Sequence, residues 1–286
     1  MAARAVPVTS KNPWIAEARA TLLLAYPLIL TNLAQALIHA TDVALLGWVG
    51  PRTLAAGALG VNVFVAFLVF GMGLVMAAAP LMAREYGARP NSVRDIRRTV
   101  RQSMWAAVMI AIPCWAIMWE SEAILLMLGQ DPALSADAAR FVRALQWGLL
   151  PYLFFLILRS FVSTLDAPIW SLVVGGAAVV INFLLNYSLI FGKFGLPELG
   201  LLGAGIGSAL SNLLMFLGMA AVVSLHPRFR RYHLFGRFWR PDFQRLRQVW
   251  KLGLPIAITL TLEVTIFAAA VFLMGLLDTA SLAAHS

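Results

Sequence analysis

Residues 169–191 read IWSLVVGGAAVVINFLLNYSLIF, an apolar run without a single charged side chain. A helix needs roughly 20 mostly apolar residues to cross the hydrocarbon core of a bilayer, and this run is long enough. Similar segments occur at about 20–46, 54–79, 103–126, 141–164, 201–225 and 252–276. The sequence therefore predicts an all-α polytopic membrane protein with about seven transmembrane helices.

The composition excludes several other classes of protein. Of the 286 residues, 61% are hydrophobic and only 12% are charged, whereas soluble domains carry about 25% charged residues. A soluble enzyme, a nucleic-acid-binding domain and a disordered chain are therefore excluded. Neither an HExxH nor a GxSxG motif occurs, so we expect no enzyme and no catalytic residues. Gly203-Ala-Gly-Ile-Gly207 resembles a dinucleotide loop, but it opens a membrane helix, where small residues favour close helix packing.

The 22 Lys and Arg residues are distributed unevenly between the two ends of the predicted helices. One end has 18 of them, in the N-terminal tail, from Arg84 to Arg101, at Arg159 in the fourth-to-fifth connection, and from Arg228 to Lys251. The other end has only Arg52, Arg140, Arg143 and Lys193. Because cationic loops stay in the cytoplasm, we expect a cytoplasmic N-terminus. Membrane lipids, and not nucleic acid, are the partners expected for these basic residues.

The sequence contains an internal repeat. Residues 24–58 align without a gap with residues 252–286, and 11 of the 35 aligned pairs are identical, including Pro27 with Pro255 and Gly47 with Gly275. The copies begin six predicted helices apart, so both cross the membrane in the same direction, as in parallel-repeat secondary transporters. Two complete copies would need about 456 residues. We therefore expect the rest of the second copy to be absent or to lie on a longer native chain.

Three polar residues are predicted to lie at one depth of the membrane, with a fourth, Asn182, one helical turn deeper. An ionisable group such as Asp42 costs about 2.5–3.5 kcal/mol inside a membrane helix, so it usually marks a functional site. Asn182 and Asn186 share one helix face because they are four residues apart, and counting from the helix ends brings Asn186 and Ser208 to the depth of Asp42. Carboxylate, amide and hydroxyl oxygens suit a proton or a small cation, with sodium at Asp42 as the candidate metal ion. The alternative is that these groups only hydrogen-bond between helices.

A second acidic residue, Glu263, is predicted near the middle of the seventh helix, and its repeat counterpart is Gln35. A carboxylate at that depth would attract cationic substrates, although it could instead pair with a threonine of its own helix. His39 precedes Asp42 by three residues and lies on the same face. It could change the proton affinity of Asp42, but a hydrogen bond to a neighbouring helix is the favoured interpretation. Glu263, Gln35 and His39 are thus the candidates for a substrate and ion path.

Four stretches of the sequence resemble the multidrug and toxic compound extrusion (MATE) family, and most closely its bacterial drug-efflux branch. The most specific stretch is 182–205, NFLLNYSLIFGKFGLPELGLLGAG. The others are LAQALIHATD at 33–42, LRSF at 158–161 and LEVTIF at 262–267. The resemblance extends from about Ala20 to Ser286.

The resemblance implies an organisation into two six-helix lobes. Residues 1–19 would form a cytoplasmic tail, 20–225 the N-lobe, 226–251 a basic cytoplasmic inter-lobe loop, and 252–286 the first helix of a truncated C-lobe. Asp42 would be the coupling-ion carboxylate, Asn182, Asn186 and Ser208 its neighbours, and Glu263 an acidic residue near the substrate path. The family often has threonine in place of Ser208, and a histidine at position 39 departs from its pattern.

The implied function is export of organic cations or drugs across the bacterial cytoplasmic membrane, driven by protons or sodium. No cofactor is expected beyond this coupling ion. Two alternatives stay open: a flippase for lipid-linked oligosaccharides with a related fold, and a membrane scaffold that transports nothing. The flippase would favour more Lys and Arg in the helix interiors, which are nearly free of both. Retinal binding is excluded because 252–276 has no lysine for a Schiff base.

Overall fold

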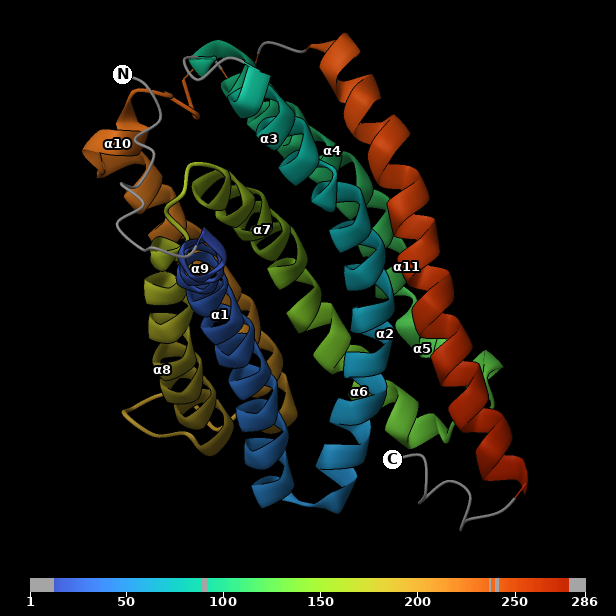
Figure 1. Ribbon diagram of the computed structural model, residues 1–286. Helices are drawn as coiled ribbons and strands as arrows, with labels where there is room; N and C mark the ends of the chain where they lie inside the picture. Colours follow the sequence, from blue (N-terminus) through green and yellow to red (C-terminus); the bar gives the residue numbers. More distant parts are fainter. Residues whose placement is uncertain (1–12, 89–91, 237, 240–241, 278–286) are drawn as a thin grey trace.

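The computed structural model describes residues 13–88, 92–236, 238–239 and 242–277. Within these residues every regular element is a helix (Figure 1). The helices are α1 (Pro13–Val49), α2 (Pro51–Met76), α3 (Ala78–Ala88), α4 (Val93–Trp119), α5 (Ser121–Met127), α6 (Pro132–Leu145), the 3-10 helix η1 (Gln146–Gly148), α7 (Leu149–Thr164), α8 (Ile169–Phe191), α9 (Gly200–Leu225), α10 (Pro227–Arg230) and α11 (Phe243–Leu277). In this part of the chain, seven helical segments are long and apolar enough to cross a membrane. The predicted all-α multi-pass membrane fold is confirmed.

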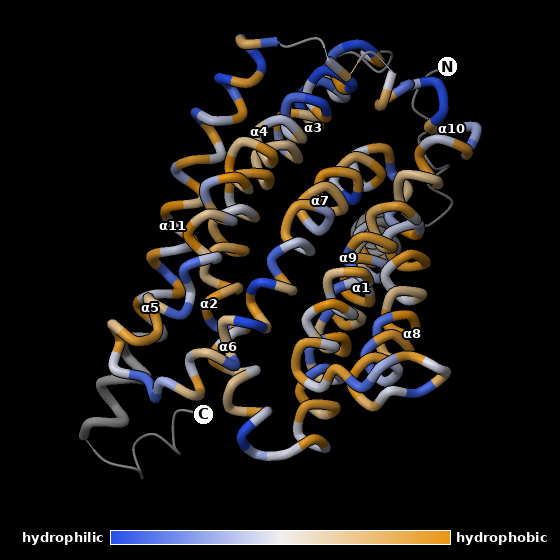
Figure 2. Tube along the Cα trace, turned by 180° about the vertical axis from the view of Figure 1, so that it is seen from behind, coloured by the Kyte–Doolittle hydropathy of each residue, from blue (hydrophilic) through white to orange (hydrophobic). Residues whose placement is uncertain are grey.

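The spanning helices form two groups on either side of α7. Figure 1 shows α1, α8 and α9 on one side and α2, α4 and α11 on the other, and Figure 2 shows the same arrangement from behind. Helix α8 packs against α9 and α1, while α11 packs against α2 and α4. Figure 2 also shows hydrophilic residues gathered where α3, α10 and the start of α11 lie, at the end predicted to be basic.

Prolines explain two interruptions inside the spans. Pro80 has no N–H to donate to the carbonyl oxygen of Met76. Because this helical hydrogen bond is missing, the helix is interrupted at Ala77, between α2 and α3. Pro151 follows η1, where the fourth predicted span tightens into a 3-10 turn between α6 and α7. These spans are therefore composite, Pro51–Ala88 and Pro132–Thr164.

Several predicted boundaries differ from the structure because hydropathy marks only the apolar part of a helix. The basic connections predicted around 84–101 and 226–251 contain parts of helices: α3 continues to Ala88, α4 begins at Val93, and α11 begins at Phe243. The placement of Arg159 in a connection is wrong, because it lies within α7 and donates a hydrogen bond to Asn32 of α1 at 2.8 Å. In the tail predicted at 1–19, residues 13–19 belong to α1, and residues 1–12 lie outside the described residues.

The two copies of the repeat run in the same direction, as predicted. Helices α1 and α11 both begin at the end marked N in Figure 1. Pro27 lies inside α1, and its counterpart Pro255 lies inside α11. The last repeat matches, at residues 282–284, lie outside the described residues.

Small residues allow backbones to approach closely, as expected for Gly203–Gly207. A methyl group at Gly203 would meet the backbone of Leu189 in α8, and one at Gly205 would meet the backbone of α6. Gly253 of α11 is packed in the same way against the backbone of α2. Gly176, by contrast, faces open space. Close packing therefore holds α8 to α9 and the first part of α11 to α2.

Candidate ion-binding site

Three of the predicted site residues meet through their side chains. Asp42 of α1 accepts a hydrogen bond from Nδ2 of Asn186 in α8 at 2.6 Å and from Oγ of Ser208 in α9 at 3.1 Å. The Asn186 amide lies 3.2 Å from the Ser208 hydroxyl. The depth count from the sequence thus agrees with a cluster that joins three helices.

Asn182 lies one helical turn from Asn186 and is completely buried. Its side chain lines the same cavity as Asp42. Neither polar atom of its amide makes a hydrogen bond of good geometry to the described part of the chain. An unsatisfied buried amide is costly. A ligand or water that enters beside Asp42 would therefore be stabilised by hydrogen bonds to Asn182.

Gly207 sets the distance between α8 and α9 at this cluster. A side chain at this position would collide with Oδ1 of Asn186, which is itself completely buried. The glycine thereby lets the Asn186 amide lie directly against α9 and reach both Asp42 and Ser208. The small-residue stretch that opens α9 thus also shapes the polar cluster.

Asp42 opens into a cavity of about 440 Å³ between α1, α2, α6, α8 and α9. Most of its wall is apolar, and Asp42 is the only carboxylate among the lining residues. His39, Asn182 and Ser208 also line it. The sequence analysis missed two polar residues of this wall, Asn62 and Asn212. Asn212 could have been found, because it lies four residues from Ser208 on one helix face.

Gln35 and Glu263 lie outside this cavity. Oε1 of Gln35 accepts a hydrogen bond from the Tyr152 hydroxyl, and its amide donates to Sδ of Met215 at 3.9 Å. Glu263 is exposed on α11, and no described residue of α11 lines the cavity. The two members of this repeat pair therefore occupy different surroundings.

The donor set suits a proton or a hard cation better than a transition metal. Asp42 supplies a carboxylate, Asn182 a buried amide and Ser208 a hydroxyl. These are the oxygen ligands that hard cations prefer, whereas soft thiolate and imidazole ligands favour zinc and copper. Within the described residues, no three His, Cys, Asp or Glu side chains are grouped as a metal site.

The sequence is similar to a known family and to its curated members. The model of the family described as MatE matches residues 27–188. A probable multidrug resistance protein NorM of Mesorhizobium japonicum is 52% identical over 276 residues, which cover 96% of this chain and 59% of that protein. A protein of the same description from Brucella suis biovar 1 is 48% identical over 281 residues, covering 98% of this chain and 60% of that protein. The chain thus spans about three fifths of the length of these relatives.

The fold is similar to solved transporter structures. The crystal structure of the eukaryotic MATE transporter AtDTX14 matches 93% of this chain and 58% of that chain, with a TM-score of 0.82 and 21% sequence identity. An outward-facing multidrug resistance MATE family transporter of the MOP superfamily matches with a TM-score of 0.75 at 19% identity, over 89% of this chain and 55% of that chain.

Proposed function

The chain belongs to the MATE family, and we propose that it forms part of a multidrug efflux transporter that exports organic cations in exchange for protons or sodium. The observation that carries this proposal is the Asp42 carboxylate, held by Asn186 and Ser208 beside a cavity between membrane-spanning helices. We propose the bacterial cytoplasmic membrane as its location, with the N-terminus in the cytoplasm, because the sequence assigns most Lys and Arg residues to the end at which the N-terminus lies.

In this proposal Asp42 exchanges the coupling ion. A carboxylate in an apolar wall binds a cation or a proton because either neutralises its charge. The hydroxyl of Ser208 and the amide of Asn186 keep the empty carboxylate hydrogen-bonded. Ion binding drives transport only if the ion binds one arrangement of the helices more tightly than the other. Opening and closing of the cavity around Asp42 would provide that difference.

Glu263 and the Gln35 cluster have a different role in this proposal. Glu263 lies in the exposed part of α11, beyond the residues that pack against α2. It carries the negative charge that would attract a cationic substrate. Gln35 and Tyr152 are half-buried and contact the buried thioether of Met215, so a substrate would reach this cluster through Gln35 and Tyr152. The substrate and the coupling ion would then occupy separate positions.

Ethidium efflux tests the role of Asp42. Cells that express the native gene should lose efflux, to less than about one tenth, when it encodes Asp42→Asn, because the amide cannot accept a proton or balance a cation. The matched control is Asp166→Asn, an exposed residue in a turn with a positive φ of 55° that asparagine tolerates. Full efflux by the Asp42 variant at equal expression would refute the proposed ion site. A sodium-free buffer then separates sodium coupling from proton coupling.

A further inference from the structure

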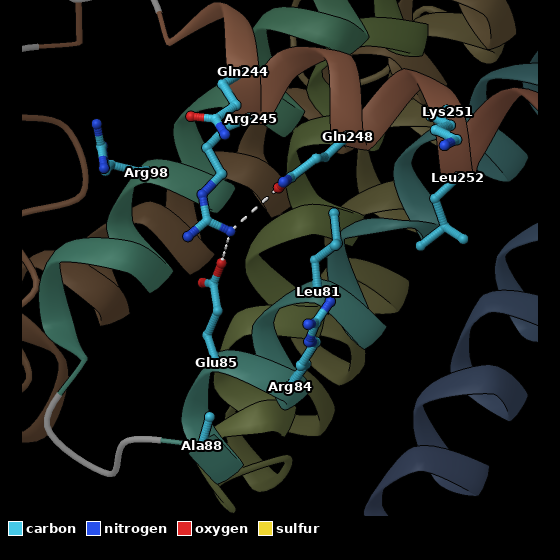
Figure 3. A pocket seen from close by; sticks show the side chains of 10 residues that line it. All are labelled: Leu81, Arg84, Glu85, Ala88, Arg98, Gln244, Arg245, Gln248, Lys251 and Leu252. Carbon is cyan, nitrogen blue, oxygen red and sulfur yellow. Dashed lines mark hydrogen bonds and ion pairs between the residues drawn. The ribbon is translucent and has the colours of Figure 1, made fainter.

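A charged pocket of about 680 Å³ lies between α3 and the start of α11. Figure 3 shows Arg84 and Glu85 rising from α3 toward the helix that carries Arg245, Gln248 and Lys251. Its wall also contains apolar residues, Leu81, Ala88 and Leu252. The pocket therefore combines cations with apolar surface at the basic end of the membrane-spanning helices.

A network of ion pairs fixes the walls of this pocket. Arg245 pairs with Glu85 of α3 and, at 3.5 Å, with Asp95 of α4. Arg98 of α4 pairs with Asp242, just before α11, at 2.9 Å. The side chains of Glu85 and Asp242 are only 10% and 15% exposed. The network thus connects α11 to both α3 and α4.

Arg84 and Lys251 are left outside this network. Both are exposed, and neither makes an ion pair or a hydrogen bond with the described part of the chain. The network itself has three carboxylates and two arginines, so these two residues leave one positive charge in excess at the pocket. A single phosphodiester group carries the charge that would neutralise it.

We propose that the pocket binds the phosphate of an anionic membrane lipid between Arg84 and Lys251. The pocket lies where the spanning helices reach the membrane surface, and basic residues at this level attract anionic headgroups. Leu81 and Leu252 provide apolar surface for the glycerol and upper acyl chain of a lipid, which a free phosphate ion lacks. The site does not depend on transport, since it lies outside the Asp42 cavity.

Binding at this position has a structural consequence. Its two cations belong to α3, which precedes the basic connection at 226–242 in the sequence, and to α11, which follows it. A bound headgroup would contact both helices only while α11 is packed against α2 and α4. The lipid would therefore stabilise this packed arrangement over one in which α11 has moved away.

Native mass spectrometry of the purified full chain tests the proposal. We expect the chain to retain phosphatidylglycerol but not phosphatidylcholine, which has the same phosphodiester with no net charge. The double variant Arg84→Gln/Lys251→Gln should bind phosphatidylglycerol about 30-fold more weakly, from about 1 kcal/mol for each basic residue at a membrane surface. The matched control is Arg94→Gln/Arg230→Gln, which removes two exposed cations at the same end outside the pocket.

Three outcomes would overturn the proposal. Equal weakening in the pocket and control variants would show only diffuse attraction to negative charge. Unchanged retention in the pocket variant would exclude the site. Displacement of the lipid by millimolar inorganic phosphate would identify a soluble phosphate as the ligand. Thermal unfolding of each variant serves as the check on folding.

Discussion

Gly207→Ala should disturb the hydrogen-bonded cluster of Asp42, Asn186 and Ser208 without changing any polar residue. The new methyl group would occupy the position of Oδ1 of Asn186, so the amide must turn away from Asp42 and Ser208. Hydrogen bonds inside membrane proteins contribute about 0.6 kcal/mol on average and up to about 1.7. Loss of the two bonds made by Nδ2 therefore costs about 1–3 kcal/mol. The substitution also gains about 1 kcal/mol of helix propensity.

Gly176→Ala is the matched control because it makes the same change inside a helix, at a position where the added methyl group would face open space. It gains the same helix propensity and loses no hydrogen bond. The Gly207 variant should therefore be about 1–3 kcal/mol less stable than the control, a difference of roughly 2–12 °C in unfolding temperature. A thiol-reactive dye can report the unfolding, since the only cysteine in the sequence, Cys114, is buried in the folded protein.

A double-mutant cycle identifies the cause of the destabilisation. In an Asn186→Ala background the colliding side chain is gone, so Gly207→Ala should no longer destabilise the protein. If the two glycine variants unfold at the same temperature, or if the penalty persists without Asn186, the geometric argument is wrong.

Two other substitutions test charged residues of α11, Glu263 and Arg245. Glu263→Gln should weaken efflux of cationic dyes several-fold more than efflux of neutral dyes, because only the cations lose an electrostatic attraction; equal loss for both would contradict a charge role. Arg245→Gln should lower stability by about 1–3 kcal/mol because it leaves the buried Glu85 carboxylate without its cation. Arg52→Gln is the control, because it breaks an ion pair in which Arg52 is 68% exposed. It should change stability by less than about 1 kcal/mol, measured for both variants by thermal unfolding with the thiol-reactive dye. A comparable loss of stability in both variants would refute the burial argument.

The sequence predicted the spans and the Asp42 cluster well because both depend on distance along a helix. Apolar length fixes where a helix crosses the membrane, and counting from its ends fixes the depth of a side chain. That count brought Asp42, Asn186 and Ser208 to one level, where they form hydrogen bonds. Depth does not fix rotation about the helix axis, however. Gln35 and Glu263 correspond in the repeat, yet Gln35 contacts Tyr152 whereas Glu263 is exposed.

The polar ends of the helices were harder to predict. Hydropathy placed the start of the last helix at 252, but α11 begins at Phe243. The residues between these positions include Arg245, which pairs with residues more than a hundred positions away. Such long-range pairs stabilise a polar helix end that its own apolar content does not indicate. The charged pocket between α3 and α11 was therefore not expected from the sequence.

Helix α2 connects the proposed ion site to α11. Its first half lines the cavity from Leu54 to Asn62. Its second half packs against α11, where side chains at Gly73 or Gly253 would collide with the facing backbone. A rigid helix with two such contacts can transmit a displacement from one end to the other, provided that it has two discrete arrangements. The described side chains of α11 from Ile258 to Ile266 are mostly exposed. The buried contacts of α11 with its neighbours are therefore concentrated between Val249 and Ala257, and these are the contacts that would break if α11 moved away from α2. In the proposed transporter, an ion that closes the cavity around Asp42 would act on α11 through α2, across the close contacts at Gly73 and Gly253.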